Sequence, residues 1–233
     1  AAAQRFYGDV LGWQIGASGM PGMDSRIARA GGDMVAGMMA PPPEAPTAWI
    51  IYFATPDCDA TVKAVMAAGG KTYMAPTDIP GVGRFAALAD PQGAAFCVLT
   101  GAGEGSSTAF DQRKTGHGNW HELTTSDPKA ALAFYGAQFG WTAGTAMDMG
   151  AMGTYRIFAH RGADIGGMMA LPPGLTMPFW LPYFGADGID AAIGRITKGG
   201  GKVMHGPAEV PGGAWIVQAT DPQGAFFALV GPK

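Results

Sequence analysis

The stretch SDPKAALAFYGAQFGW, residues 126–141, contains a complete set of signals for one helix. The side chain of Asp127 can cap the first turn, and Pro128 suits the first helical position because that position needs no backbone N–H donor. Apolar residues then follow at helical spacing, and Gly140 ends the helix. Residues 120–125, directly before this stretch, have the pattern of a strand. The sequence therefore predicts a strand followed by a capped helix.

Several motifs of this chain occur twice in the same order, which indicates an internal duplication. The repeated motifs are FYG at residues 6–8 and 134–136, GMMA at 37–40 and 167–170, and DPQGA at 90–94 and 221–225. The offset between the copies changes only from 128 residues at the first motif to 131 at the last. Since unrelated segments would not keep so constant an offset, the chain consists of two copies of one unit.

Each copy is expected to fold as two βαβββ modules, which gives an α+β fold. In the second copy, strands are expected at residues 120–125, 142–147, 154–160, 164–169, 179–186, 202–209, 214–219 and 225–230, and helices at 129–139 and 189–198. The first copy has no counterpart of the opening strand, because Ala1 aligns with Lys129. The last strand is apolar on both faces. We therefore expect curved mixed sheets with helices on one face and a cavity on the other.

Composition and charge exclude several classes of partner. Charged residues make up 14% of the chain, against about 25% in an average soluble protein, and the net charge is −3. No run of Lys and Arg offers the positive surface that nucleic acids require, and no basic amphipathic helix suits a membrane surface. No apolar stretch is long enough to cross a bilayer. We expect a small-molecule partner, and the low charge also allows a homodimer contact.

The two cysteines, Cys58 and Cys97, form neither a disulfide framework nor a CxxC motif for zinc or redox chemistry. No signal peptide is recognisable ahead of the first helical pattern. A cytoplasmic location is the expectation.

The order of a strand, an SDP helix start, an FYxxxxGW helix end and a closing DPxG strand resembles the vicinal-oxygen-chelate superfamily. This superfamily includes glyoxalase I, extradiol dioxygenases, fosfomycin-modifying enzymes and bleomycin-resistance proteins. The resemblance covers both copies, and the tandem form is similar to two-domain glyoxalase-like proteins. It implies four βαβββ modules in two glyoxalase-like domains, residues 1–101 without the opening strand and residues 118–233, joined by a flexible linker at 102–117.

Members of this superfamily usually bind a divalent metal through His, Gln or Glu on the first, fifth and eighth strands. The resemblance places the equivalent positions at Trp120, Leu181 and Ala228 in the second copy, and at Ile50 and Cys97 in the first. None of these residues is His, Gln or Glu. We therefore expect no cofactor and no metal ligand set, and these five residues become candidates for contact with an organic ligand.

Glu122 is the candidate catalytic residue. It shares a strand face with Trp120, whereas His121 points to the opposite face. A carboxylate that faces an apolar cavity is suited to proton transfer. The alternative interpretation is a carboxylate at the cavity mouth that is solvated or paired with an Arg.

Two recurring tyrosines, Tyr52 and Tyr183, lie on the same strand face as the fifth-strand positions. They are candidates for hydrogen bonds to a ligand, and Phe179 joins them as an apolar contact. The alternative is a core tyrosine with a satisfied hydroxyl. Trp49 and Trp180 fall on the opposite face and are expected to pack against helices.

Three functions remain open. The leading hypothesis is a metal-free protein of the glyoxalase and bleomycin-resistance type that binds an apolar or aromatic molecule. It would either only sequester this molecule or also act on it by isomerase- or lyase-type proton transfer with Glu122. The second is a metal-dependent lyase or dioxygenase with atypical ligands such as Glu122 with a His or Cys97. The third is a non-enzymatic oligomeric interaction module.

Among the histidines, His117 has no counterpart in the other copy and is expected at the surface.

Overall fold

The computed structural model describes every residue except 1, 21, 23 and 104. The first copy forms α1 (Ala2–Leu11), β1 (Gln14–Ala17), β2 (Ser25–Ala30), β3 (Asp33–Met39), β4 (Tyr52–Ala54), α2 (Cys58–Ala67), β5 (Lys71–Ile79), β6 (Gly83–Ala89) and β7 (Ala95–Gly101). The second forms β8 (Gly118–Thr125), α3 (Pro128–Phe139), β9 (Thr142–Asp148), β10 (Thr154–His160), β11 (Ala163–Ala170), β12 (Phe179–Gly185), α4 (Ile189–Lys198), β13 (Lys202–Glu209), β14 (Trp215–Thr220) and β15 (Phe226–Gly231). The predicted α+β fold is confirmed. None of the described helices combines the length and the apolar character that a membrane crossing needs.

The start and end signals predicted for the helix α3 are confirmed. The Asp127 side chain accepts a hydrogen bond from the Ala130 backbone N–H at 3.0 Å, Pro128 begins α3, and Gly140 ends it in the left-handed conformation at φ +70°. A left-handed residue is least strained as glycine, which explains why the motif has glycine at this position.

The chain divides into two compact units, and each contains half of each copy. Unit 1 comprises Ala1–Trp49, Ser106–Trp120 and Pro182–Lys233, and unit 2 comprises Ile50–Gly105 and His121–Leu181. The copies seen in the sequence are therefore continuous, whereas the compact units are interleaved.

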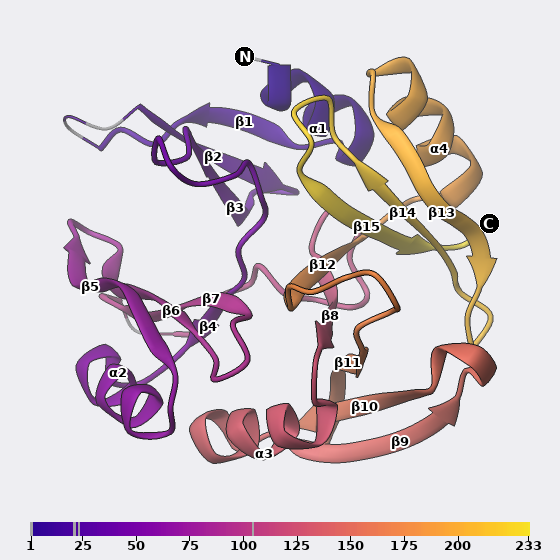
Figure 1. Cartoon of the computed structure of the whole chain (residues 1–233). Helices are drawn as coiled ribbons and strands as arrows, with labels where there is room; N and C mark the ends of the chain where they lie inside the picture. The colour runs from indigo at the N-terminus through magenta and orange to yellow at the C-terminus, as the bar shows by residue number, and fades with distance from the viewer. Residues whose placement is uncertain (1, 21, 23, 104) are drawn as a thin grey trace. The chain divides into compact units, whose positions relative to one another are not determined.

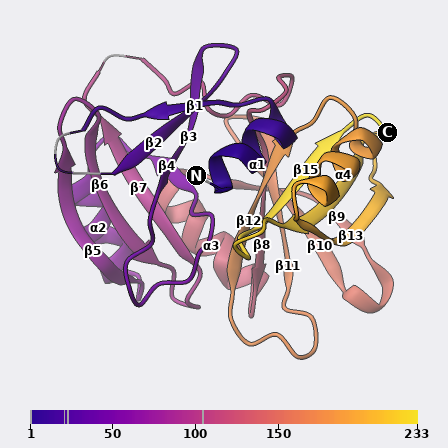
Figure 2. The same ribbon diagram turned by 90° about the horizontal axis from the view of Figure 1, so that it is seen from above.

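Each unit contains antiparallel strands together with at least one parallel pair. Unit 1 has the order β1-β2-β3 and the order β13-β14-β15-β12, and α1 packs beside α4 (Figures 1 and 2). Unit 2 has the orders β4-β7-β6-β5 and β8-β11-β10-β9, and α2 packs against α3. The parallel pairs are β12–β15, β4–β7 and β8–β11. Irregular register, as between Phe158 and Ala159 in β10, is typical of bulged and bent strands, which suits curved sheets.

The core of unit 2 contains a hydrogen-bond chain built from the repeated motifs. The Trp180 indole N–H donates to the Tyr135 hydroxyl at 3.0 Å, and that hydroxyl donates to the Asp90 carboxylate at 3.0 Å. The other Asp90 oxygen accepts three backbone N–H groups of the DPQG turn and its next residue, the closest at 2.8 Å. Burial, and then the Asp90 charge, raise the pKa of Tyr135, so its hydroxyl remains a donor.

Unit 1 contains the same chain with the copies exchanged. The Trp49 indole N–H donates to the Tyr7 hydroxyl at 2.8 Å, and Tyr7 donates to the Asp221 carboxylate at 3.1 Å. Tyr and Trp come from one copy and Asp from the other in both units. The expectation that Trp49 and Trp180 pack on the helix side is confirmed, since each belongs to a helix-packed core.

The expectation that His117 is exposed is wrong. His117 is 2% exposed, and its Nε2 lies 3.1 Å from the Asp33 carboxylate. The neighbouring Gly116 carbonyl accepts a hydrogen bond from the Trp13 indole N–H at 2.7 Å. The end of the segment predicted as a flexible linker, residues 102–117, is thus bonded into unit 1. Its Gly- and Ser-rich composition gave no sign of this, because the partners lie far away in sequence.

The hydrogen-bond chain predicts the effect of removing one hydroxyl. Tyr135→Phe takes away the donor to Asp90 and the acceptor for Trp180, so the free energy of unfolding should fall by about 2–3 kcal/mol in urea denaturation. Tyr73→Phe is the matched control, because Tyr73 is 63% exposed, and it should change stability by less than about 0.5 kcal/mol. Equal effects of the two substitutions would show that the buried chain contributes little.

Candidate functional site

Strand β8 separates its side chains between two faces. Leu123 is fully buried in the helix-packed core of unit 2, and the His121 ring lies 6.2 Å from the Phe53 ring in the same core. Burial lowers the pKa of His121 to about 4, so it is neutral near pH 7. Glu122, between them, belongs to the opposite face, which is the face that the sequence analysis assigned to it.

Glu122 is joined to a tyrosine that the sequence analysis did not single out. The Tyr155 hydroxyl, from β10, donates to the Glu122 carboxylate at 3.1 Å, and Glu122 is 9% exposed. The tyrosine reaches β8 across β11, where Gly167 is the residue paired with Glu122. A Cβ atom on Gly167 would collide with the Tyr155 ring. The glycine of the repeated GMMA motif thus makes room for this contact.

Unit 1 has a comparable contact across a small residue. Tyr183 in β12 and Gln218 in β14 both pair with Ala228 in β15, and the Gln218 amide donates to the Tyr183 hydroxyl at 2.8 Å. Tyr183 is 3% exposed, and Ala228 is fully buried. The alternative that the sequence left open, a tyrosine with a satisfied hydroxyl, describes Tyr183 in this structure. A ligand atom would have to replace or share the Gln218 hydrogen bond.

The first copy has the same tyrosine but different residues at the other two of these three positions. Tyr52 in β4 and Ala87 in β6 both pair with Cys97 in β7. Tyr52 and Cys97 share a side-chain hydrogen bond, and burial raises the pKa of the Cys97 thiol to about 11. Tyr52 is 49% exposed, whereas its counterpart Tyr183 is buried. The two copies have therefore diverged on this sheet face. In the second copy Gln218 bonds to the buried Tyr183, whereas in the first copy Tyr52 is exposed.

The remaining predicted contact residues differ in accessibility. Ile50 is 46% exposed and Leu181 is 1% exposed, while Trp120 and Phe179 are partly buried. Strand pairing brings Tyr52 to Cys97 and Tyr183 to Ala228, and Glu122 is brought to Tyr155.

The residues at the family's ligand positions do not fit a divalent metal. Of the five, only Cys97 has a donor atom, and its raised pKa keeps the thiol protonated near pH 7, whereas metals bind the thiolate. Within the part of the chain that the structure describes, no three His, Cys, Asp or Glu side chains gather into a set that could hold a metal ion. A transition-metal site needs several such donors in one place.

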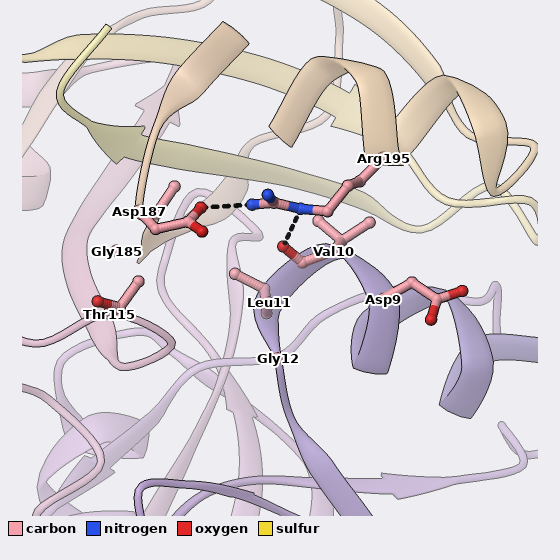
Figure 3. Close-up of a pocket in the computed structure, with 9 residues that line it drawn as sticks. Asp9, Val10, Leu11, Gly12, Thr115, Gly185, Asp187 and Arg195 are labelled. Carbon is pink, nitrogen blue, oxygen red and sulfur yellow. Dashed lines mark hydrogen bonds and ion pairs between the residues drawn. The ribbon is translucent and has the colours of Figure 1, made fainter. Parts of the chain in front are cut away.

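A pocket of about 170 Å³ lies in unit 1, and none of the residues predicted for the site lines it (Figure 3). It is lined by Asp9, Val10, Leu11, Gly12, Thr115, Gly185, Ala186, Asp187 and Arg195. The Arg195 guanidinium donates to the Val10 carbonyl at 3.2 Å and to the Asp187 carboxylate at 2.5 Å. This pocket is smaller than the roughly 300 Å³ or more of typical ligand sites, and its arginine is already bonded. This pocket is therefore a weak candidate for a ligand site.

Two family profiles match the chain. Residues 1–99 match a family described as "Glyoxalase-like domain", and residues 117–229 match "Glyoxalase/Bleomycin resistance protein/Dioxygenase superfamily". "Putative glyoxylase CFP32" of Mycobacterium tuberculosis is 34% identical over 238 residues, which span 100% of this chain and 90% of that protein. "Anthracycline biosynthesis protein DnrV" of Streptomyces peucetius is 37% identical over 188 residues, which span 79% of this chain and 66% of that protein.

Solved structures share the fold at low sequence identity. The Mn(II)-bound glyoxalase from Novosphingobium aromaticivorans has a TM-score of 0.66 at 19% identity, covering 99% of this chain and 77% of that one. The 2,2',3-trihydroxybiphenyl 1,2-dioxygenase from Sphingomonas wittichii strain RW1 has a TM-score of 0.69 at 12% identity, covering 99% of this chain and 84% of that one. At such identities the likeness concerns the fold and not the reaction.

The space above Gly167 can be tested by a double-mutant cycle. Gly167→Ala should lower the free energy of unfolding by about 1–3 kcal/mol, because the new methyl group displaces the Tyr155 ring. Tyr155→Ser removes that ring, so the double variant should be more stable than the sum of the single effects by at least about 1 kcal/mol. Gly194→Ala, in open space on α4, serves as the control and should not be destabilising. Simple additivity would refute the contact.

The poor donor set predicts the metal content. Protein purified without a polyhistidine tag should contain less than about 0.1 equivalent of Mn, Fe, Ni or Zn by inductively coupled plasma mass spectrometry. A full equivalent of one transition metal that survives dialysis against EDTA would contradict this assignment.

Proposed function

Because this chain belongs to the glyoxalase, bleomycin resistance protein and dioxygenase superfamily, we propose that it binds a small apolar or aromatic molecule without a metal and transfers a proton on it. Glu122 is the proton acceptor and donor, and the reaction is of the isomerase or lyase type. The observation that carries this proposal is the hydrogen bond from Tyr155 to Glu122 across Gly167.

The contact with Tyr155 suits Glu122 to act as a base. The hydrogen bond holds the Glu122 carboxylate in one orientation, and a positioned base is more effective than a mobile one. Glu122 is 9% exposed, so a bound ligand would complete its removal from water. The carboxylate would take a proton from carbon beside a carbonyl group and return it to a different carbon, which is an isomerisation without net redox change.

The surroundings of Glu122 and the names of relatives favour an apolar ligand. Ile157 pairs with Gly167 from β10, so an aliphatic side chain lies on the same face as the Tyr155 ring. The relative DnrV is named for anthracycline biosynthesis, and anthracyclines are polycyclic aromatic ketones. An aromatic ketone would offer both flat apolar surface and acidic hydrogens next to a carbonyl group.

Daunorubicin, a fluorescent anthracycline with a methyl ketone, is a suitable first probe. Wild-type protein and Glu122→Gln should quench its fluorescence with Kd values within about threefold, because the amide keeps the size of the carboxylate. Only the wild type should accelerate deuterium uptake from D₂O at the methyl group beside the carbonyl, followed by mass spectrometry. Loss of the carboxylate base should slow this exchange at least about 100-fold.

Glu44→Gln is the matched control, because Glu44 is exposed, and it should keep both binding and exchange. If Glu122→Gln exchanges deuterium as fast as the wild type, Glu122 is not the base. If daunorubicin fails to bind and the purified protein carries no organic molecule in native mass spectrometry, the binding function itself is wrong.

A further inference from the structure

His117 and its neighbours fasten the segment 106–117 to the rest of unit 1. The Gly116 backbone N–H donates to the Gly185 carbonyl at 2.8 Å, and the Gly185 N–H donates to the His117 carbonyl at 2.9 Å. These two bonds join the segment to the end of β12. Gly116 has a φ of +74°, and a Cβ atom there would lie 3.1 Å from the Trp13 indole nitrogen. The segment therefore follows a close path along unit 1.

The same segment also bonds to the first residue of β8. The Gly118 backbone N–H donates to the Ala109 carbonyl at 2.8 Å, and the Asp111 N–H donates to the Gly118 carbonyl at 2.9 Å. Phe110 and Gly118 pair as an isolated parallel bridge. Loss of order in the segment would therefore also remove bonds that hold the beginning of β8.

One carboxylate at the start of β3 accepts several donors from this segment. The Lys114 ammonium donates to an Asp33 oxygen at 3.0 Å, and the same oxygen lies 3.1 Å from Nε2 of His117. The Thr108 side chain also bonds to Asp33. The hydrogen bond from Lys114, and then those from His117 and Thr108, hold the pKa of Asp33 at about 2. Asp33 is therefore a charged carboxylate near neutral pH.

Both ring nitrogens of His117 face oxygen atoms that can only accept hydrogen bonds. Nε2 faces the Asp33 carboxylate, and Nδ1 lies 3.1 Å from the Thr115 backbone carbonyl. A neutral imidazole has one N–H, so one nitrogen would direct a lone pair at an oxygen, whereas an imidazolium donates from both nitrogens. Since His117 is 2% exposed, water has little access to relieve such a repulsion. Burial disfavours a charged ring, but the carboxylate at 3.1 Å offsets this effect.

The other charged groups that the structure shows around this ring belong to the segment and to the pocket beside it. They are Lys114 and Asp111 on the segment, and Asp9, Asp187 and Arg195 in the pocket that Thr115 also lines. Side chains of the Asp, Lys and Arg types ordinarily keep their charge between about pH 5 and 8, whereas histidine changes its charge there. His117 is therefore the group of this cluster that can respond to pH in the neutral range.

We propose that His117 is an imidazolium in the folded chain and acts as a pH-sensitive clasp. In this form it donates to Asp33 and to the Thr115 carbonyl, and it holds the segment 106–117 and the beginning of β8 in place. When the pH rises and the ring releases one proton to water, one of the two bonds is lost and the segment loosens. The direction follows because a cation that folding stabilises contributes stability that disappears as pH rises. The clasp does not depend on proton transfer by Glu122.

The charge of the ring can be measured in the intact wild-type chain by nitrogen NMR. At about pH 6 both ring nitrogens of His117 should have the chemical shifts of protonated nitrogens, and at about pH 9 one of them should have the shift of an unprotonated nitrogen. The signals are assigned by their loss in His117→Gln. An unprotonated nitrogen already present at the lower pH would overturn the proposal, and so would a ring that stays fully protonated at the higher pH.

Hydrogen–deuterium exchange tests whether the segment responds to the charge of the ring. After correction for the intrinsic exchange rate at each pH, the amides of residues 106–117 should exchange at least roughly tenfold faster at the higher pH. This is the size expected when a hydrogen bond to a charged group is lost. The amides of β6 in unit 2 serve as the reference and should keep their protection. Equal protection of the segment at both pH values would refute the clasp.

Three substitutions identify the responding group in the exchange experiment. His117→Gln should give fast exchange of the segment at both pH values, because an amide does not titrate. Lys114→Gln should lower protection equally at both pH values and keep the pH dependence. His205→Gln is the matched control, because His205 is exposed, and it should behave like the wild type. If His117→Gln keeps the wild-type pH dependence, the proposal is wrong, and if this variant does not fold, the wild-type NMR titration decides.

Discussion

The structure depends on one constraint: each copy contributes a buried aspartate carboxylate that accepts a hydrogen bond from a tyrosine of the other copy. Asp90 and Asp221 organise their own DPQG turns with one oxygen and accept a tyrosine hydroxyl from the other copy with the second. A buried carboxylate without these donors would be strongly unfavourable. Since each aspartate needs the partner copy's tyrosine, neither copy completes its core alone.

This exchange explains why the compact units do not follow the sequence repeat. The cores form on the helix side, where Tyr7 and Tyr135 meet the turns of the other copy, while the repeat boundaries follow the order of the modules. The opposite sheet faces are free of this constraint and have diverged. One unit places Gln218 over Ala228, and the other places Tyr155 over Gly167, each a long polar side chain above a small residue.

The same divergence explains why the family's ligand positions lack suitable metal donors. At Ala228 the family position for the last ligand has become small, which leaves room for the Gln218 amide to reach Tyr183. At Cys97 a thiol with a raised pKa contacts Tyr52. At these two positions the protein therefore has side-chain contacts, Gln218 with Tyr183 and Cys97 with Tyr52, where metal-binding relatives would need nitrogen or oxygen donors.

Much of the fold could be predicted from the sequence, because repeated motifs fix the module and capping signals fix the helices. Strand limits agreed within a residue or two, as for 154–160 in β10 and 202–209 in β13.

The interleaved units could not be predicted, since the bond between Asp90 and Tyr135 joins residues whose contact leaves no periodic signal. Only part of the candidate site could be predicted from the sequence, for a similar reason. The alternation of side chains along a strand predicted which sheet face Glu122 lies on. Tyr155, however, contacts Glu122 across the intervening strand β11, and the only sequence feature that accompanies this contact is Gly167.

A crystal structure of the protein with a bound aromatic ketone tests the central claim most directly. The account predicts the ligand carbonyl or its neighbouring carbon within about 3–3.5 Å of the Glu122 carboxylate, with Tyr155 still bonded to that carboxylate. A transition-metal ion coordinated by side chains of this face, with the ligand oxygen bound to the ion, would contradict it.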